Sequence, residues 1–293
     1  MSSSAAASIQ FGEVPASLPN PQLTNPLLDV GADGTVLMRF PETRILIARG
    51  EEIVVAPAAE RGHGEELAAA LEPLLMPAAL SFLLHQRKTI MPLRASVVSV
   101  DGEAVAFLGN PGLGKSTLAA ALIQRGARLL SEDLAVVRPG AQGLEALPGP
   151  QRLSIWPDSL KHLGIDVEQT TSLRAHTPVR SWAPDVATQP QRLRMSILLR
   201  ASGDTQEIRF ENVASRTYLM AAATIGYMQP LVQLFRGTPA QFITLTGLAT
   251  HVPLWRLERS IHPLDSKGDI ERCADLILAH LKDAPAETAT EGN

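Results

Sequence analysis

The chain has 293 residues, of which 45% are hydrophobic, and a formal net charge of -4 at pH 7. This length and apolar content can fill one large core or two modest ones. The mild negative charge and the lack of a basic stretch argue against nucleic acid as a partner. A single cysteine, Cys273, excludes an internal disulfide, and its place in a helical pattern indicates a buried thiol in a reducing compartment. We therefore expect a globular, cytoplasmic protein.

The sequence gives no signal for export or for a membrane. Residues 1–8 lack the positive start and the apolar block of a secretory signal. The most apolar window, residues 67–84, contains Glu72, Pro73 and Pro77, which suit buried, kinked helices better than a membrane span. We therefore predict no membrane partner.

The first 90 residues predict a small β-rich region followed by a helix. Short apolar runs at 35–40, 44–48 and 53–55 are separated by Gly, Pro and Asp turn signals, which favours a mostly antiparallel sheet. Residues 65–85 have a helical pattern. The sequence thus divides into an N-terminal β-rich and helical region over 1–90, a main domain over 91–283 and a disordered tail over 284–293.

The main domain opens with a strand, loop, helix and strand in succession. Residues 96–100 and 104–108 flank Asp101-Gly102, a dipeptide that favours a hairpin turn. A helix is predicted over 115–125, with Gly126 as its left-handed terminator, and another strand begins at Leu129. Further along we expect strands at 153–156, 195–200 and 207–211, helices at 157–163, 215–226 and 269–282, and a polar loop over 170–191 that could cover a site.

A glycine-rich loop follows the hairpin. Residues 109–116 read GNPGLGKS and satisfy G-x-x-x-x-G-K-[ST] without a deviation. Such glycines let backbone N–H groups turn toward phosphate oxygens, and the helix N-terminus adds partial positive charge. Lys115 should reach the terminal phosphates and the Ser116 hydroxyl should help to hold magnesium, which predicts ATP and Mg²⁺ as ligands. The predicted nucleotide-binding residues are Gly109, Asn110, Pro111, Gly112, Leu113, Gly114, Lys115, Ser116 and Thr117, the last better placed to pack.

Two acids, Glu132 and Asp133, end the strand that follows the loop's helix, where open α/β sheets build their sites. One of them can accept the proton of an attacking hydroxyl while the other binds magnesium directly or through water. The alternative interpretation is a solvated turn. We predict a catalytic set of Lys115, Glu132, Asp133 and Arg94, with Ser116 and Asp133 at the metal.

Residues 105–134, with the run G-x-x-x-x-G-K-S-T-L-A-x-x-L-x-x-R-G-x-x-L-L-x-[ED]-D, resemble the HPr kinase/phosphorylase superfamily. More specifically they are similar to HPr-kinase-like proteins encoded beside peptide-modifying enzymes, including kinases of lasso-peptide precursors. Residues 152–163, which contain Trp156-Pro157-Asp158-Ser159-Leu160, extend the resemblance to about two thirds of the chain. It implies an α/β fold with a phosphoenolpyruvate-carboxykinase-like P-loop core of mixed sheet and helices, ATP as donor, and a serine hydroxyl on a peptide or small protein as acceptor.

Three departures from the family pattern bear on activity. Arg94 stands where the resembling proteins usually have a histidine that supports the acidic base, and arginine cannot exchange a proton at neutral pH. Glu132 replaces the first Asp of the usual pair. A Glu-x-Arg-Gly-Leu-Gly segment is missing, so phosphorylase activity is not expected. A nucleotide-binding scaffold that has lost transfer and a small-molecule kinase therefore stay open as alternatives.

Two arginines beyond the loop, Arg152 and Arg180, are candidates for contacting phosphate or substrate, since they lie in or beside the resembling segments. The alternative is that each is simply solvated, because Arg is mostly exposed wherever it occurs. Related proteins often assemble as homo-oligomers, and the sequence does not fix a number.

Overall fold

The computed structural model describes residues 8–40, 43–56, 77–87, 91–172, 178–202, 207–214, 217, 239–260 and 269–283. The chain divides into two compact units, Met1–Pro92 with Tyr227–Phe242 and Leu93–Gly226 with Ile243–Asn293. No helix among the described residues combines the length and the apolar character that crossing a membrane requires.

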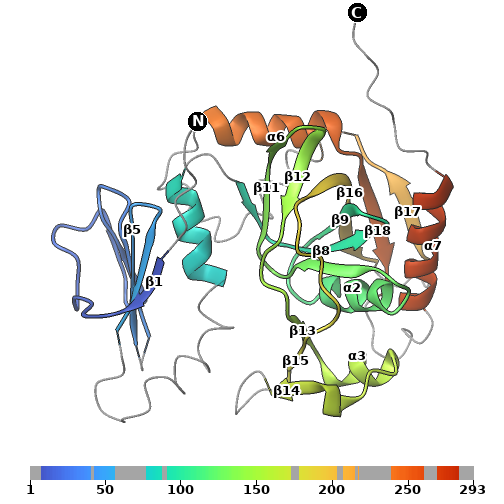
Figure 1. Ribbon diagram of the computed structural model, residues 1–293, viewed down its shortest axis with the longest axis horizontal. Helices are drawn as coiled ribbons and strands as arrows, with labels where there is room; N and C mark the ends of the chain where they lie inside the picture. The colour runs from blue at the N-terminus through green and yellow to red at the C-terminus, as the bar shows by residue number, and fades with distance from the viewer. Residues whose placement is uncertain are drawn as a thin grey trace, which may run out of the picture. The chain divides into compact units, whose positions relative to one another are not determined.

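The first unit contains a six-stranded sheet in the order β1-β6-β5-β4-β3-β2. Figure 1 labels its strands β1 and β5. Its strands are β1 (Ser8–Phe11), β2 (Leu23–Thr24), β3 (Leu28–Val30), β4 (Val36–Arg39), β5 (Arg44–Ala48) and β6 (Glu52–Val55). Neighbouring strands are antiparallel except β1 and β6, which are parallel. The predicted β-rich region is therefore confirmed.

One face of this sheet packs on a helix over residues 77–87. Alternate residues of β5, Ile45 and Ile47, are buried together with Phe82 and Leu83 of the helix, as the two-residue period of a half-buried strand requires. The helical prediction over 65–85 is confirmed for 77–85, and its first part lies outside the described residues.

Asp29, a buried carboxylate on β3, links this strand to its neighbours β2 and β4. It accepts hydrogen bonds from the Thr24 hydroxyl (2.6 Å) and the Leu18 N–H (2.9 Å), and it forms an ion pair with Arg39. The Thr24 hydrogen bond, with help from Leu18 and Arg39, outweighs the effect of burial and lowers the pKa of Asp29 to about 2. The carboxylate therefore stabilises the sheet in its charged form.

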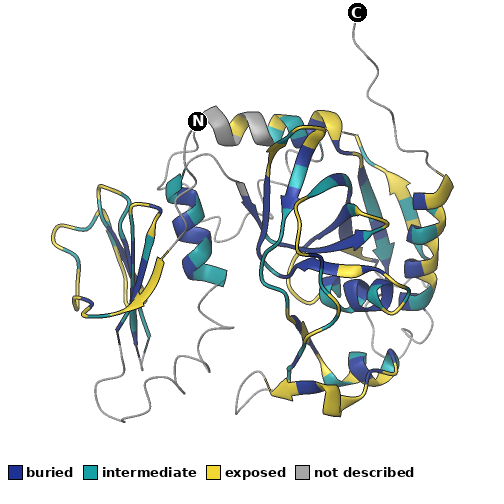
Figure 2. Ribbon diagram, viewed as in Figure 1, coloured by how far each residue is buried: buried dark blue, intermediate teal, exposed yellow. Residues whose placement is uncertain are grey.

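The strands of the second unit belong to a nine-stranded mixed sheet, in the order β10-β8-β9-β16-β12-β11-β7, with β18 beside β16 and β17 beside β18; the last strand, β7, contains the boundary between the units. The strands are β7 (Met91–Leu93), β8 (Ala95–Val100), β9 (Glu103–Leu108), β10 (Arg128–Ser131), β11 (Ala135–Gly140), β12 (Gly143–Leu147), β16 (Gln191–Ala201), β17 (Arg209–Asn212) and β18 (Leu254–Arg259). Figure 2 shows β8 and β9 buried and β17 exposed. The predicted mixed α/β fold is confirmed.

The direction of the strands decides where a site can form. Strand β9 is parallel to β16, and β16 is parallel to β18. Strand β8 is antiparallel to both β9 and β10, so that β10 runs in the same direction as β9. The carboxyl ends of β9, β10, β16 and β18 therefore meet at one edge of the sheet, the usual place for a site in an open α/β sheet.

The hairpin predicted at Asp101-Gly102 is present between β8 and β9. Both turn residues have positive φ, 51° and 85°, which matches the twist of a two-residue hairpin. Helix α2 (Lys115–Ile123) follows the glycine loop, and Gly126, with φ 98°, closes it by donating its N–H to Ile123 O at 3.0 Å. The predicted strand, loop, helix and strand are thus confirmed.

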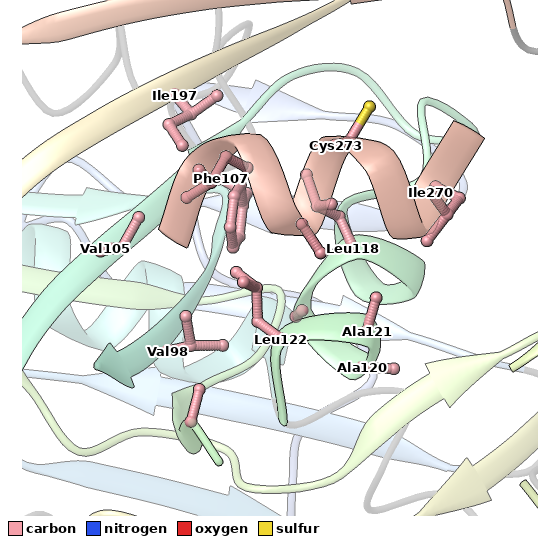
Figure 3. Close-up of a cluster of buried hydrophobic side chains, with 14 of the residues drawn as sticks. Val98, Val105, Phe107, Leu118, Ala120, Ala121, Leu122, Ile197, Ile270 and Cys273 are labelled. Atoms are coloured by element: carbon pink, nitrogen blue, oxygen red, sulfur yellow. The ribbon is translucent and has the colours of Figure 1, made fainter. Parts of the chain in front are cut away.

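Helix α2 packs between the sheet and helix α7 (Asp269–Asp283) in a fully apolar core (Figure 3). Leu118 and Leu122 of α2, Phe107 of β9 and Cys273 of α7 belong to one buried cluster, all with exposure near zero. The predicted amphipathic helix and the predicted buried thiol are both confirmed.

The predicted polar loop over 170–191 is wrong in part. Strands β13 (Leu153–Ile155), β14 (Thr170–Ser172) and β15 (Arg180–Trp182) form a small antiparallel sheet in the order β13-β15-β14. Helix α3 (Pro157–His162) follows β13 as predicted. Strands β11, β12 and β18 and helix α6 (Pro239–His251) were not predicted. The helix expected over 215–226 lies, except for Thr217, outside the described residues, as does the tail after 283.

Candidate functional site

The glycine loop joins the carboxyl end of β9 to α2 in a conformation that requires glycine. Gly112 and Gly114 have φ of 85° and 83°, and an added Cβ on Gly109 would lie 3.2 Å from the Leu199 carbonyl oxygen. Gly114 is the N-cap of α2, and no side chain caps the helix. The first N–H groups of α2 are therefore available to an anion, and the helix dipole favours negative charge there.

Lys115, the first residue of α2, is buried, with 8% of its surface exposed. Its ammonium donates to Gly109 O at 2.9 Å and to Asn110 O at 3.2 Å. Burial, assisted by the positive charge of Arg94, lowers the pKa of Lys115, and the carboxylates that follow β10 oppose this shift. The ammonium thus lies within the electrostatic reach of the predicted catalytic acids.

Glu132 is the buried member of the acidic pair, with 6% exposure. Its Oε1 accepts a short hydrogen bond from Ser116 Oγ, while its N–H donates to Pro150 O at 2.7 Å. Oε2 is buried and has no hydrogen-bond partner of ordinary geometry among the described residues. Burial raises the pKa of Glu132 to about 7, against the opposing effect of the Ser116 and Ser96 hydroxyls. This carboxyl therefore changes charge near neutral pH.

Asp133 occupies a different environment from its neighbour. Its backbone is left-handed, with φ 60°, a conformation that Asp tolerates better than most residues. The side chain is 33% exposed, and Oδ1 lies 3.2 Å from Nε of Arg94. The Asp133 carbonyl also accepts from the Ala95 N–H at 3.2 Å, which ties the turn to the start of β8. The left-handed turn thus separates a buried acid from an accessible one.

Five of the residues singled out in the sequence come together at this edge: Lys115, Ser116, Glu132, Asp133 and Arg94. Ser116 contacts Glu132 and Arg94 contacts Asp133, so the serine expected at the metal stands beside the first acid of the pair. The two oxygen-bearing groups at Ser116 and Glu132, one with a buried oxygen that lacks a partner, fit the preference of Mg²⁺ for oxygen ligands. Within the described ranges no cluster of three or more His, Cys, Asp or Glu forms a metal site by itself.

The other predicted contacts belong to the small sheet. Arg152 donates to Ser181 Oγ at 3.0 Å, and Arg180 donates to Thr170 Oγ1 at 2.9 Å and to Thr170 O at 3.0 Å. These bonds link strands β13, β14 and β15 to one another. Thr117 packs toward α3 and donates to Ser159 Oγ at 3.3 Å, as its expected packing role implies.

Sequence reasoning missed Arg259, the last residue of β18. This arginine is 6% exposed, and its Nη2 lies 3.3 Å from the carbonyl oxygen of Leu113 in the glycine loop. No motif includes Arg259, and β18 itself was not predicted, so its contact with the loop could be found only from the fold.

No family model matches the chain. Over 95 residues it is 32% identical to the HPr kinase/phosphorylase of Prosthecochloris aestuarii, a match that covers 32% of this chain and 28% of that protein. Over 100 residues it is 29% identical to the HPr kinase/phosphorylase of Chlorobium phaeovibrioides, covering 34% and 30% respectively. The matched segment thus spans less than a third of the length of these curated relatives.

A solved structure of the Hpr(Ser) kinase/phosphatase from Coxiella burnetii aligns with 66% of this chain and 97% of that chain, with 16% identity and a TM-score of 0.34. The sequence matches confirm the resemblance to HPr kinase/phosphorylases that the loop segment predicted.

Proposed function

We propose that this HPr kinase-like chain is an ATP-dependent phosphotransferase that transfers the terminal phosphoryl group of ATP to a serine hydroxyl on a peptide or small protein. The observation that carries the proposal is the placement of a glycine loop and a helix N-terminus beside two adjacent carboxyl groups in different environments. This combination suits phosphoryl transfer, in which catalysis rests on positioning and on charge stabilisation.

The loop and Lys115 supply the nucleotide site. The N–H groups at the start of α2 and the dipole of that helix would stabilise phosphate oxygens, and the buried ammonium of Lys115 can exchange its two loop carbonyls for the terminal phosphates. When bound, magnesium would neutralise phosphate charge. The Ser116 hydroxyl and the Glu132 carboxylate are the groups that would hold it, and Asp133 remains the second candidate.

The accessible acid, Asp133, is the better placed of the two to receive the proton of an incoming hydroxyl. In the proposed step the serine oxygen forms a bond to the terminal phosphorus, the bond to the bridging oxygen breaks and ADP leaves. The hydroxyl proton passes to the carboxylate. Glu132, which faces Ser116, is the less accessible candidate for this role.

Arg94 would orient the base and stabilise charge. Its Nε lies 3.2 Å from Asp133 Oδ1, in a pair with 39% and 33% exposed side chains. An arginine at this position cannot take part in proton exchange, but it holds the carboxylate in place and adds a positive charge near the phosphates.

The acceptor is the part of the proposal that rests on resemblance. The relatives are named as kinases of HPr, which favours a protein acceptor, and the serine comes from the sequence resemblance of the loop segment. The more specific sequence resemblance favours a peptide, such as a lasso-peptide precursor. We propose likewise that residues 91–283 form the catalytic domain, that residues 1–90 form a separate one, and that the protein works in the cytoplasm.

A magnesium-dependent assay with labelled ATP and a mixture of serine-containing peptides tests the function. A peptide should gain about 80 Da, the mass of one phosphoryl group, with one ADP formed per transfer. Lys115→Ala should abolish the gain, and Arg138→Ala, at an exposed position of β11, should retain it. Full transfer activity in Lys115→Ala would refute the proposal.

The ion pair between Arg94 and Asp133 favours a second candidate function, a nucleotide-binding scaffold, because it engages the accessible acid. On this alternative the protein binds ATP and forms neither phosphopeptide nor ADP. The double variant Arg94→His with Glu132→Asp should then gain turnover. Brisk turnover by the wild type would exclude the scaffold.

A further inference from the structure

A buried arginine touches the glycine loop from outside the sequence motif. Arg259 ends β18 at the same edge of the sheet as the end of β9, because both strands are parallel to β16. Its guanidinium donates from Nη1 to Ser260 O at 2.9 Å and from Nη2 to Leu113 O at 3.3 Å. Burying a cation costs free energy, and Arg259 has only 6% of its surface exposed. Its hydrogen bonds to backbone carbonyls offset part of this cost.

The contact between Arg259 and the loop restricts which residue can stand at position 114. A Cβ added to Gly114 would lie 2.3 Å from Arg259 Nη2, well inside the contact distance. Gly114 is thus required by its φ of 83°, and a side chain at this position would also have to displace the guanidinium.

The hydrogen bond to Leu113 fixes the direction of one peptide group. In a planar trans peptide the C=O of one residue and the N–H of the next point in opposite directions. When Arg259 holds the Leu113 carbonyl toward itself, the Gly114 N–H is directed to the opposite side of the loop. Gly114 is the N-cap of α2, where the N–H groups of a phosphate loop face the anion.

We propose that Arg259 is a positioning residue that holds the Leu113–Gly114 peptide in the orientation needed to bind the phosphates of a nucleotide. This inference rests on the proposed nucleotide site. It makes Arg259 a determinant of phosphate affinity that acts through the loop backbone, without belonging to the loop.

The surroundings of Arg259 support a positioning role. Its Nε is buried without a hydrogen-bond partner among the described residues, so the side chain is not held by a complete set of bonds of its own. Asp269, 3% exposed at the start of α7, acts on it only at longer range and forms its ion pair with Arg272 instead. Among the described residues, the bond to Leu113 is therefore one of the two hydrogen bonds that the guanidinium forms.

Two variants separate positioning from folding. Arg259→Met keeps much of the volume and removes every donor, while Arg259→Lys keeps a charged donor for the Leu113 carbonyl. The matched control is Arg194→Met on β16. Arg194 also bonds a backbone carbonyl, that of Leu281 in α7, but it lies opposite the start of β9, at the far end from the loop.

Calorimetry with ATP and with inorganic tripolyphosphate gives the dissociation constants, and thermal unfolding gives the stability of each variant. Arg259→Met should raise the dissociation constants of both ligands about tenfold, the effect of losing one charge-assisted hydrogen bond from the Gly114 N–H to phosphate. Arg259→Lys should recover part of this affinity. Arg194→Met should lower stability and leave both dissociation constants unchanged.

Unchanged affinity in a folded Arg259→Met protein would overturn the inference while leaving the kinase proposal intact. Wild-type protein that binds neither ligand would overturn the nucleotide site and the inference together. ATP binding without transfer would refute only the kinase reaction. Failure of both Arg259 variants to fold would also overturn the inference, because a residue whose role lies in the loop must be replaceable without loss of the fold.

Discussion

Glu132 gives the sharpest physical test of the site, because the folded protein raises its pKa from 4.5 to about 7. A group whose pKa is raised on folding binds its proton more tightly in the folded state. The free energy of unfolding therefore falls as pH rises from about 4.5 to about 7 and levels off above. A shift of this size corresponds to about 3 kcal/mol, since one pKa unit is worth about 1.4 kcal/mol.

The perturbation is Glu132→Gln, which keeps the shape and removes the titration. Glutamine can still accept the Ser116 hydrogen bond, but its amide N–H₂ would take the place of Oε2, which has no ordinary partner. That constant cost of about 1–3 kcal/mol does not depend on pH. The informative quantity is therefore the change with pH of the difference between the two proteins.

Urea unfolding at pH 5, 6, 7 and 8, without nucleotide or magnesium, measures that difference. The free energy of unfolding of Glu132→Gln, measured relative to that of wild type, should rise by up to about 3 kcal/mol between pH 5 and pH 8. Asp133→Asn, whose exposed ion pair is worth less than about 1 kcal/mol, serves as the control. A difference between Glu132→Gln and wild type that stays constant from pH 5 to pH 8 would show that the reasoning about burial is wrong.

Four further outcomes follow from the structure. In steady-state assays Asp133→Asn should lower kcat at least 100-fold with little change in ATP affinity, as removal of a general base implies; unchanged kcat would reassign the base to Glu132. Gly114→Ala should abolish ATP binding in calorimetry, because the new Cβ meets both a positive φ and the Arg259 guanidinium. Cys273 should react with a thiol reagent only on unfolding, since it is fully buried and burial raises its pKa to about 11; rapid labelling of native protein would contradict this. The free energy of unfolding of Asp29→Asn should depend less on pH between 4 and 2 than that of wild type, because the lowered pKa of Asp29 gives stability that is lost as pH falls toward 2; parallel profiles in urea unfolding would argue against it.

The elements that carry local signals were predictable from the sequence. The hairpin at Asp101-Gly102, the glycine loop and the helix ended by Gly126 each depend on residues close together in the chain. Strands β14 and β15 have three residues each and lie in a polar, Pro-bearing stretch, so no periodicity could reveal them. Their pairing with β13 across the fold is a tertiary effect.

The division between the two acids was also beyond sequence reasoning. Adjacent carboxyl groups look equivalent in a motif, and only the left-handed backbone at Asp133 separates a buried side chain from an exposed one. The contact of Arg259 with Leu113 joins residues far apart in the chain, through a strand that the sequence did not indicate. A residue that reaches the site through the order of strands in the sheet has no local sequence pattern that would predict it.

Strand pairing also explains how this site can hold its geometry. The loop leaves β9 at Leu108, which pairs with Ala95 of β8, and Ala95 in turn donates to the Asp133 carbonyl. Loop and acids are thus connected through two adjacent strand pairs instead of through a long flexible segment. Because a shift of about 1 Å can cost about 100-fold in rate, a hydrogen-bonded frame of this kind is suited to phosphoryl transfer. The register of β8 and β9, together with the Ala95 hydrogen bond, thus fixes where the glycine loop begins relative to the acids.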